Sequence, residues 1–168
     1  MTESTVASTV VQVHRVYIKA SAQAIWDAIV DPAWNARYGY QAPSKYDLRP
    51  GGAYRAMPSK PMRDSGAPDV IIEGEVISAD PPHRLVQTWR ALFNPAMAEE
   101  GPTKLTWEID EIGGGGVCRV TITHELENAP VTAAQVGGEI AEAGGGWDMI
   151  LSDLKTLLET GSSFQNWD

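Results

Sequence analysis

The sequence predicts an α+β domain in which a curved antiparallel sheet of about seven strands wraps around a long C-terminal helix, with two short helices after the first strand. Three observations favour this fold class. Short apolar runs separated by glycine and proline turns fill the segment from Tyr46 to Glu125, as in an antiparallel meander. One apolar stripe follows helical spacing from Thr132 to Thr160. Tryptophans occur in both regions, which indicates a cavity between the sheet and the helix.

The first elements follow from the residues near the start of the chain. Apolar residues concentrated between Val11 and Lys19 predict the first strand. Ser21 can cap a helix, because its side-chain oxygen can accept a free backbone N–H. Apolar residues at i, i+3 and i+4 follow, and Asp31-Pro32 ends this helix. A second helical turn is expected over Trp34 to Tyr38.

The middle of the chain predicts six further strands. Turn signals such as Pro50-Gly51-Gly52 and Gly113 to Gly116 divide them. The connection from Ala91 to Pro102 is looser and is a candidate rim or lid loop. The expected strands are Tyr46 to Leu48, Ala53 to Met57, Val70 to Ala79, Arg84 to Arg90, Thr103 to Ile112 and Val117 to Glu125.

The last expected element is one helix from Thr132 to Thr160. Thr132 and Gln135 have capping-box spacing, and Gly161 suits the position after a helix end. Three glycines, Gly144 to Gly146, interrupt the pattern, and each costs a helix about 1 kcal/mol relative to alanine. We therefore expect either a kink at these glycines or the close approach of the sheet or of the early helices.

Composition limits the domain count and the partners. The 168 residues suit one domain, expected at 11–161 between a flexible N-terminus at 1–10 and a C-terminal tail at 162–168. The net charge of −9, without a basic cluster, disfavours binding to nucleic acid or to a membrane surface. No stretch has the length and apolarity of a membrane span, and a cytoplasmic location is expected. Cys118 is expected to be a buried structural thiol.

Several short motifs carry a resemblance that extends from about Val11 to Gly161. They are Ala20-Ser21-Ala22 with Trp26, Asp31-Pro32 with Trp34, Asp47 to Gly52, Gly74-Glu75-Val76, Asp80 to Val86 with Trp89, Leu105 to Glu108, Thr121 to His124, and Gly146-Trp147 with Leu154-Lys155 and Leu158. In this order and spacing they resemble the helix-grip fold of the START-like (SRPBCC) superfamily, and within it the homologues of the activator of the heat-shock-protein-90 ATPase. The resemblance implies the fold and a cavity between sheet and helix. It implies no particular activity, because members include cochaperone domains, lipid and hormone binders and polyketide cyclases, and it supplies no catalytic residues to transfer.

The aromatic residues are the main candidates for a functional site. Several rings facing an open space would be costly unless that space is filled or dry, since apolar burial contributes roughly 25 cal/mol/Å². Packing in the core is the alternative for each ring. The sequence thus predicts a small, mostly apolar or aromatic (lipid-like) ligand. The residues expected to bind it are Trp34, Tyr38, Tyr40, Tyr54, Trp89, Trp107, His124, Trp147 and Leu151.

Two other functions remain open at this stage. One is an enzyme of the cyclase or hydrolase kind that uses a buried carboxylate or His124 in the same cavity. The other is an interaction module that acts on a chaperone, which the resemblance implies. The sequence also leaves open whether the protein forms a homodimer. The strand pairs Glu73 with Glu75 and Glu108 with Asp110 share a strand face at i and i+2, where we expect them to be solvated.

No cofactor or metal site is indicated by motif. The chain lacks HExxH spacing, a cysteine pair, a nucleophile elbow and a phosphate loop. His14 and His124 could approach each other if the first and last strands pair.

Overall fold

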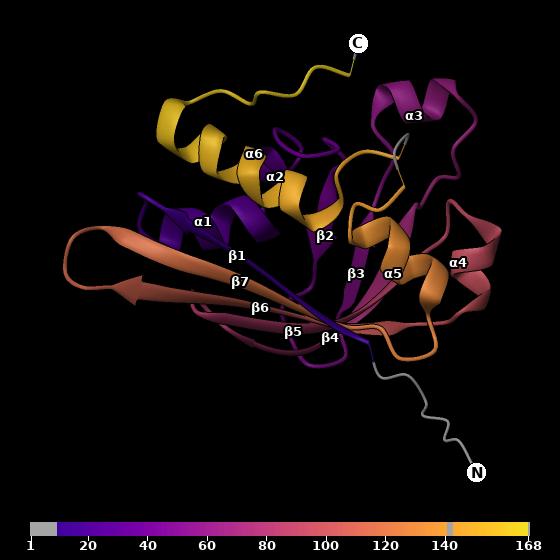
Figure 1. Ribbon diagram of the computed structural model, residues 1–168, viewed down its shortest axis with the longest axis horizontal. Helices are drawn as coiled ribbons and strands as arrows, with labels where there is room; N and C mark the ends of the chain where they lie inside the picture. The colour runs from indigo at the N-terminus through magenta and orange to yellow at the C-terminus, as the bar shows by residue number, and fades with distance from the viewer. Residues whose placement is uncertain (1–9, 141–142, 168) are drawn as a thin grey trace.

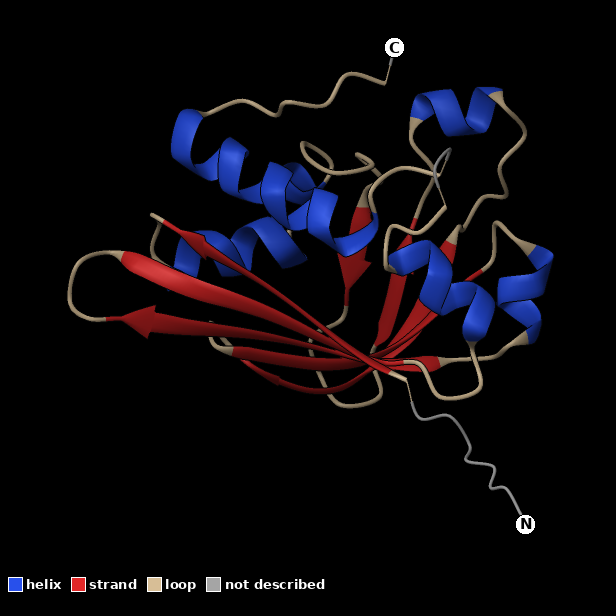
Figure 2. Cartoon of the chain, in the orientation of Figure 1, coloured by secondary structure: helices blue, strands red, loops and turns tan. Residues whose placement is uncertain are grey.

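The computed structural model describes residues 10–140 and 143–167, and these form one curved sheet covered by helices on one side (Figures 1 and 2). The expected flexible N-terminus lies, apart from Val10, outside the described residues. The seven strands pair only with antiparallel neighbours, in the order β1-β7-β6-β5-β4-β3-β2. They are β1 Val11–Ile18, β2 Ser44–Tyr46, β3 Ala53–Ala56, β4 Ile72–Asp80, β5 Arg84–Ala91, β6 Thr103–Ile112 and β7 Val117–Glu125.

The helices of the described residues are α1 Ala22–Val30, α2 Pro32–Asn35, α3 Lys60–Asp64, α4 Pro95–Glu99, α5 Pro130–Val136 and α6 Gly146–Thr160. The fold class and the strand pattern predicted from the sequence are confirmed. Two short helices, α3 and α4, were not expected. The second of them begins where the Asn94 side chain accepts the backbone N–H groups of Ala96 and Met97, inside the predicted loop from Ala91 to Pro102.

Side-chain caps fix the two helices that follow β1. The Ser21 hydroxyl accepts the Ala24 N–H at 3.1 Å, as the sequence predicts for α1. Asp31 in turn caps α2, which therefore starts at Pro32 and ends at Asn35, earlier than the expected turn over Trp34 to Tyr38. The buried Asn35 amide donates to Ile29 O and to Ser44 O, so it ties α1 and α2 to the edge strand β2.

The prediction of one continuous helix from Thr132 to Thr160 is wrong. The chain forms α5 and α6 instead, and the glycines of the expected helix lie at the junction; residues 141 and 142 of that helix are outside the described part. Gly144 and Gly146 adopt φ angles of +89° and +64°, which the interior of a right-handed helix does not allow, so α6 can only begin at Gly146. The predicted C-terminal stop holds, since Gly161 is left-handed and its N–H bonds to Leu157 O at 2.8 Å.

Close packing explains why this junction needs glycine. A Cβ atom on Gly146 would lie 2.2 Å from the backbone oxygen of Val136, and one on Gly144 would lie 2.5 Å from the Tyr40 hydroxyl. The close approach predicted for these glycines therefore exists, but its partners are α5 and the loop after α2 rather than the sheet.

The concave face of the sheet forms the core with α1 and α6. Register places Trp107 of β6 between Leu85 of β5 and Ile122 of β7, so three strands present apolar side chains to the same side. Leu154 and Leu157 of α6 are buried against this layer. Cys118 is buried, as expected.

The free edge of β1 is partly covered by α6. Lys155 Nζ donates to Tyr17 O at 2.7 Å, and Glu159 accepts the Lys19 N–H at 2.8 Å. Lys155 and Glu159 also bond to each other across one helical turn. Within the described residues, no helix has the length and apolar character required to cross a membrane.

Candidate functional site

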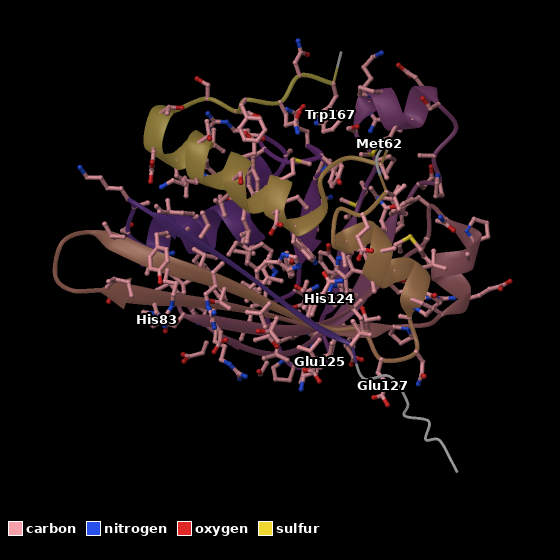
Figure 3. All side chains as sticks on the ribbon, in the orientation of Figure 1. Met62, His83, His124, Glu125, Glu127 and Trp167 are labelled. Atoms are coloured by element: carbon pink, nitrogen blue, oxygen red, sulfur yellow. The ribbon has the colours of Figure 1, made fainter. Side chains whose placement is uncertain are left out.

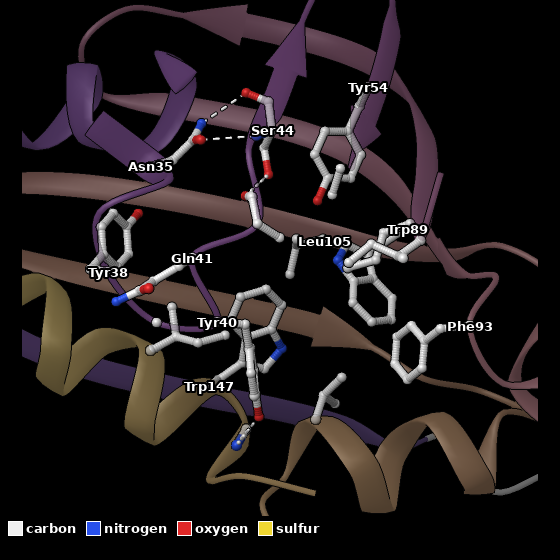
Figure 4. Close-up of a pocket in the computed structure, with 18 of the residues that line it drawn as sticks. Asn35, Tyr38, Tyr40, Gln41, Ser44, Tyr54, Trp89, Phe93, Leu105 and Trp147 are labelled. Carbon is white, nitrogen blue, oxygen red and sulfur yellow. Dashed lines mark hydrogen bonds between the residues drawn. The ribbon is translucent and has the colours of Figure 1, made fainter. Parts of the chain in front are cut away.

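A cavity of about 400 Å³ lies between the sheet, the loop after α2 and the start of α6 (Figure 4). Eight aromatic residues form much of its wall, and aliphatic side chains fill most of the remainder. None of the described residues that line it is charged. The aromatic residues are Tyr38, Tyr40, Tyr46, Tyr54, Trp89, Phe93, Trp107 and Trp147.

Six of the nine residues predicted to bind a ligand line this cavity. They are Tyr38, Tyr40, Tyr54, Trp89, Trp107 and Trp147. Sequence reasoning missed Tyr46, Phe93 and Gln41. Phe93 belongs to the segment predicted to form the rim, so its position in the chain was a usable signal. Tyr46 stacks on Tyr54 at 4.6 Å between ring centroids, which follows from their pairing in register across β2 and β3.

Three of the predicted residues lie outside the cavity wall. Trp34 is 36 % exposed, and the Arg37 guanidinium lies 4.6 Å from its ring centroid. The cause is the early start of α2, which leaves Trp34 on the outer side of this short helix. Leu151 and His124 are buried, but Leu151 packs in the core and His124 lies behind the wall.

His124, which is labelled in Figure 3, makes ring contacts with two wall tryptophans, Trp89 and Trp147. Thr103 Oγ1 donates to Trp89 O at 2.7 Å, so the 2.7 Å contact between Thr103 Oγ1 and His124 Nε2 has the imidazole as donor. His124 Nδ1 accepts from Trp147 Nε1 at 3.1 Å. This pattern fixes the neutral tautomer that carries its proton on Nε2.

Burial, with a smaller contribution from nearby His14, lowers the pKa of His124 to about 3. Both ring nitrogens are occupied and the ring stays neutral, so His124 has no free lone pair for a proton from a ligand. It is therefore a positioning residue for Trp89 and Trp147 in this structure.

His14 belongs to a separate hydrogen-bond network. It lies opposite Ile122 on β7, while Gln12 lies opposite His124. Its Nδ1 contacts the Asp148 carboxylate at 2.8 Å and its Nε2 contacts Gln12 Oε1 at 2.9 Å. The two histidines therefore do not form a shared site. No group of three potential metal ligands occurs in the portion of the chain that the structure describes.

The tyrosine hydroxyls of the wall are mostly engaged with the protein. Tyr38 donates to Ala28 O and Tyr46 to Gln87 Oε1, both at 2.9 Å. Tyr40 donates to Ala143 O and accepts the Gly146 N–H, so it joins both sides of the helix break. Burial raises the pKa of Tyr38 and of Tyr46 well above the ordinary value, so these phenols remain neutral.

The described part of the C-terminal tail braces one wall of the cavity. The buried Asp153 carboxylate accepts from the Gly39 N–H, from Ser163 Oγ and from the Phe164 N–H. Trp167 donates to Gly39 O at 2.8 Å and stacks on Tyr40. These bonds hold the Gly39–Tyr40 segment in place beside the cavity.

The paired carboxylates lie outside the cavity. Glu73 contacts Arg90 at 3.2 Å, and Glu108 and Asp110 are about half exposed. None of them lines the space that a ligand would occupy.

Comparison with known proteins identifies the family. A family model described as activator of Hsp90 ATPase homolog 1-like protein matches residues 19–159. No curated protein matches the chain. CalU16 from Micromonospora echinospora is 19% identical over 91% of this chain and 78% of its own, with a TM-score of 0.63. An HSP90 activator from Plasmodium falciparum is 18% identical over 89% of this chain and 96% of its own, with a TM-score of 0.59.

The Aha1 dimer from Colwellia psychrerythraea has a similar fold. It is 16% identical over 90% of this chain and 98% of its own, with a TM-score of 0.61. At these identities the structural similarities establish the fold alone. The family model extends over most of the chain, and the protein therefore belongs to the activator of Hsp90 ATPase homolog 1-like family.

Proposed function

We propose that this protein binds a small, mostly apolar or aromatic molecule in the cavity between its sheet and α6. One observation carries the proposal: a cavity of about 400 Å³ whose described wall is mainly aromatic and aliphatic and has no charged side chain. Ligand sites typically span roughly 300 to 1,000 Å³ and are mainly apolar with a few polar groups. A filled cavity would also remove apolar ring surface from water, at about 25 cal/mol/Å².

Binding is better supported than catalysis in this cavity. The two groups considered for acid–base work, His124 and a buried carboxylate, are both engaged. His124 uses both ring nitrogens, and Asp153 is the buried acid among the described residues. The oxygens of Asp153 accept three hydrogen bonds from the protein, and Asp153 is not among the residues that line the cavity.

A neutral fluorescent probe tests the proposal. N-phenyl-1-naphthylamine should bind with a saturable rise in its emission. Ala42 lines the cavity, so Ala42→Trp should fill part of it and weaken binding by about tenfold or more. Ala33→Trp makes the same substitution at an exposed position of α2 and serves as the control, which should bind like the parent. No emission change up to the solubility limit, or equal binding by both variants, would refute the proposal.

Stimulation of a chaperone ATPase is the second candidate. The family match and the fold shared with the Plasmodium HSP90 activator favour it. The test is the steady-state ATPase rate of an Hsp90-type chaperone with and without the protein. An unchanged rate at saturating protein would argue against this function. A homodimer stays a prediction, which the mass measured by sedimentation equilibrium would decide.

A further inference from the structure

The three tryptophans of the cavity wall differ in what their indole N–H groups contact. Trp147 Nε1 donates to His124 Nδ1 at 3.1 Å. The Trp89 side chain is hydrogen-bonded to the Tyr54 hydroxyl, and its N–H is the donor because an indole nitrogen has no acceptor capacity. Trp107 Nε1 is buried and has no hydrogen-bond partner among the described residues. The wall therefore contains one unpaired indole donor beside two that are paired.

Most other polar side chains of the wall are already hydrogen-bonded within the protein. Within residues 10–140 and 143–167, the one other buried side-chain nitrogen or oxygen without a partner is Nε of Arg119, a residue that does not line the cavity. The wall residues whose side chains donate to protein acceptors are Tyr38, Tyr40, Tyr46, Asn35 and Gln135.

Trp107 is held within the sheet side of the wall. Its register partners are Leu85 on β5 and Ile122 on β7, and the residue is 5 % exposed. The Trp147 ring packs against it edge-to-face, at 5.8 Å between ring centroids. A contact between an N–H group and an aromatic face is much weaker than a hydrogen bond to oxygen, so the Trp147 ring does not replace an acceptor.

An unpaired donor beside a cavity indicates what the cavity can hold. Buried donors without a partner are uncommon in proteins, because such a group loses its hydrogen bond to water and gains none. A buried water needs 2–4 polar partners, and most polar side chains of this wall are engaged. A bound molecule is therefore the better source of an acceptor. Since Nε1 is covered by the packed wall, side chains around it must shift slightly to admit an acceptor to about 2.7–3.2 Å.

The charge of the wall restricts the ligand further. An ionised group in this cavity would lose its hydration without meeting an opposite charge from any described lining residue, and that transfer is strongly unfavourable. A neutral acceptor, such as a ketone oxygen, loses less hydration and can accept the Trp107 proton.

We propose that the cavity selects uncharged, largely aromatic compounds that carry a carbonyl group, and that Trp107 Nε1 donates a hydrogen bond to the carbonyl oxygen. This inference rests on the proposed binding function and adds the chemical class of the ligand. Trp89 and Trp147 contribute apolar ring surface, because their N–H groups are engaged with the protein (Figure 4).

Two matched probes test the inference on the unmodified protein. 2-Acetylnaphthalene carries a ketone, and 2-isopropenylnaphthalene has nearly the same shape with a methylene group in place of the oxygen. From the strength of a neutral hydrogen bond, the ketone should bind about 2- to 10-fold more tightly than partition into apolar solvent predicts for the pair. At pH 7.5, 2-naphthoate should bind more weakly than the ketone. Dissociation constants come from displacement of N-phenyl-1-naphthylamine.

The indole N–H signals report the hydrogen bond directly. A ¹H–¹⁵N spectrum contains one indole signal per tryptophan, six in this chain, and the signal missing from Trp107→Phe belongs to Trp107. The ketone should move the Trp107 indole proton downfield of its position with the hydrocarbon. The Trp147 indole proton, already bonded to His124, should respond alike to both probes.

Variants assign the preference to one indole. Trp107→Phe should remove the excess preference for the ketone. Trp89→Phe makes the same substitution elsewhere in the wall and should keep the preference, because the N–H that it removes is engaged with Tyr54. Circular dichroism confirms that each variant is folded, and the comparison of probes on the parent protein does not depend on the variants.

The outcomes separate the two proposals. If both neutral probes bind but the ketone has no excess preference, or Trp107→Phe retains it, the inference about Trp107 is wrong while cavity binding stands. The same Trp107 indole shift with both probes, or tighter binding of 2-naphthoate than of the ketone, would also overturn it. If neither neutral probe binds, the proposed binding function fails and the inference fails with it.

Discussion

At the residue scale, His124 shows how a polar side chain shapes an apolar site without entering it. Its neutral ring bonds to Thr103 on one side and to Trp147 on the other. Its edge-to-face contact with Trp89 spans 5.3 Å between centroids. Two tryptophans of the cavity wall are therefore oriented by one buried histidine.

This arrangement predicts a specific loss of stability in acid. Burial lowers the pKa of His124 from its ordinary value of 6.5 to about 3 in the folded protein. Between these two pH values the unfolded chain therefore binds more protons than the folded protein. The free energy of unfolding should therefore fall as pH falls from 6.5 toward 3, by up to about 1.4 kcal/mol per pH unit from this group. His124→Gln removes the titration and should give a shallower slope in urea unfolding measured from pH 7 to pH 4.

His83→Gln provides the matched control, because it makes the same substitution at an exposed turn position. Equal slopes for the parent and His124→Gln would show that burial of His124 does not govern the acid response.

The identities of the site residues could be predicted in part. Aromatic residues on concave-face strands, such as Trp89 and Trp107, follow from the alternation of β5 and β6. Trp34 could not be placed correctly, because its direction depends on where α2 begins, and Asp31 with Pro32 shifts that start. His124 occupies a concave position, but its hydrogen-bond partners come from β6 and α6, far away in sequence.

At the scale of elements, strands were easier to predict than helices. Thr103–Ile112 and Val117–Glu125 match the predicted bounds, because a run of four glycines separates two alternating segments. The break between α5 and α6 was not predicted as such. An apolar stripe shows which face is buried but carries no information about a positive φ. The predicted helix therefore ran on through Gly144 and Gly146, where positive φ angles separate α5 from α6.

The break predicts unequal effects for two glycine substitutions. Gly146→Ala places a Cβ 2.2 Å from Val136 O and keeps a φ of +64°, which costs about 1–2 kcal/mol by itself. We expect a loss of more than about 2 kcal/mol in the free energy of unfolding. Gly115→Ala has no heavy atom within 4 Å and should change stability by less than about 0.5 kcal/mol. Chemical denaturation measures both.

A Gly146→Ala variant as stable as Gly115→Ala would mean that the junction relaxes easily. In that case the α5–α6 connection would not constrain Tyr40, whose hydroxyl accepts the Gly146 N–H.

At the scale of the whole molecule, packing and cavity occupy different parts of one concave surface. The side chains of α6 that point to the sheet are buried at Leu154 and Leu157, whereas Trp147 and Ile150 near its start reach the cavity. One helix, α6, thus contributes to both the packed core and the cavity wall. Its packing in the core helps to keep the shape of the cavity.

The overall charge leads to a further expectation. With 22 acidic and 13 basic residues, the protein should repel the phosphate backbone of nucleic acids. Fluorescence anisotropy of a labelled DNA duplex should show no binding at micromolar protein near physiological ionic strength. Binding that weakens steeply with added salt would contradict this expectation.

The contact of α6 with the edge of the sheet has a consequence for solubility. An uncovered edge strand offers free backbone groups to another chain and can recruit it by β-sheet extension. Lys155 Nζ donates a hydrogen bond to Tyr17 O near the end of β1, and the Glu159 carboxylate accepts one from the Lys19 N–H just beyond it. The pair that anchors α6 therefore also places charge at the strand end, where intermolecular pairing and fibrillar aggregation would otherwise begin.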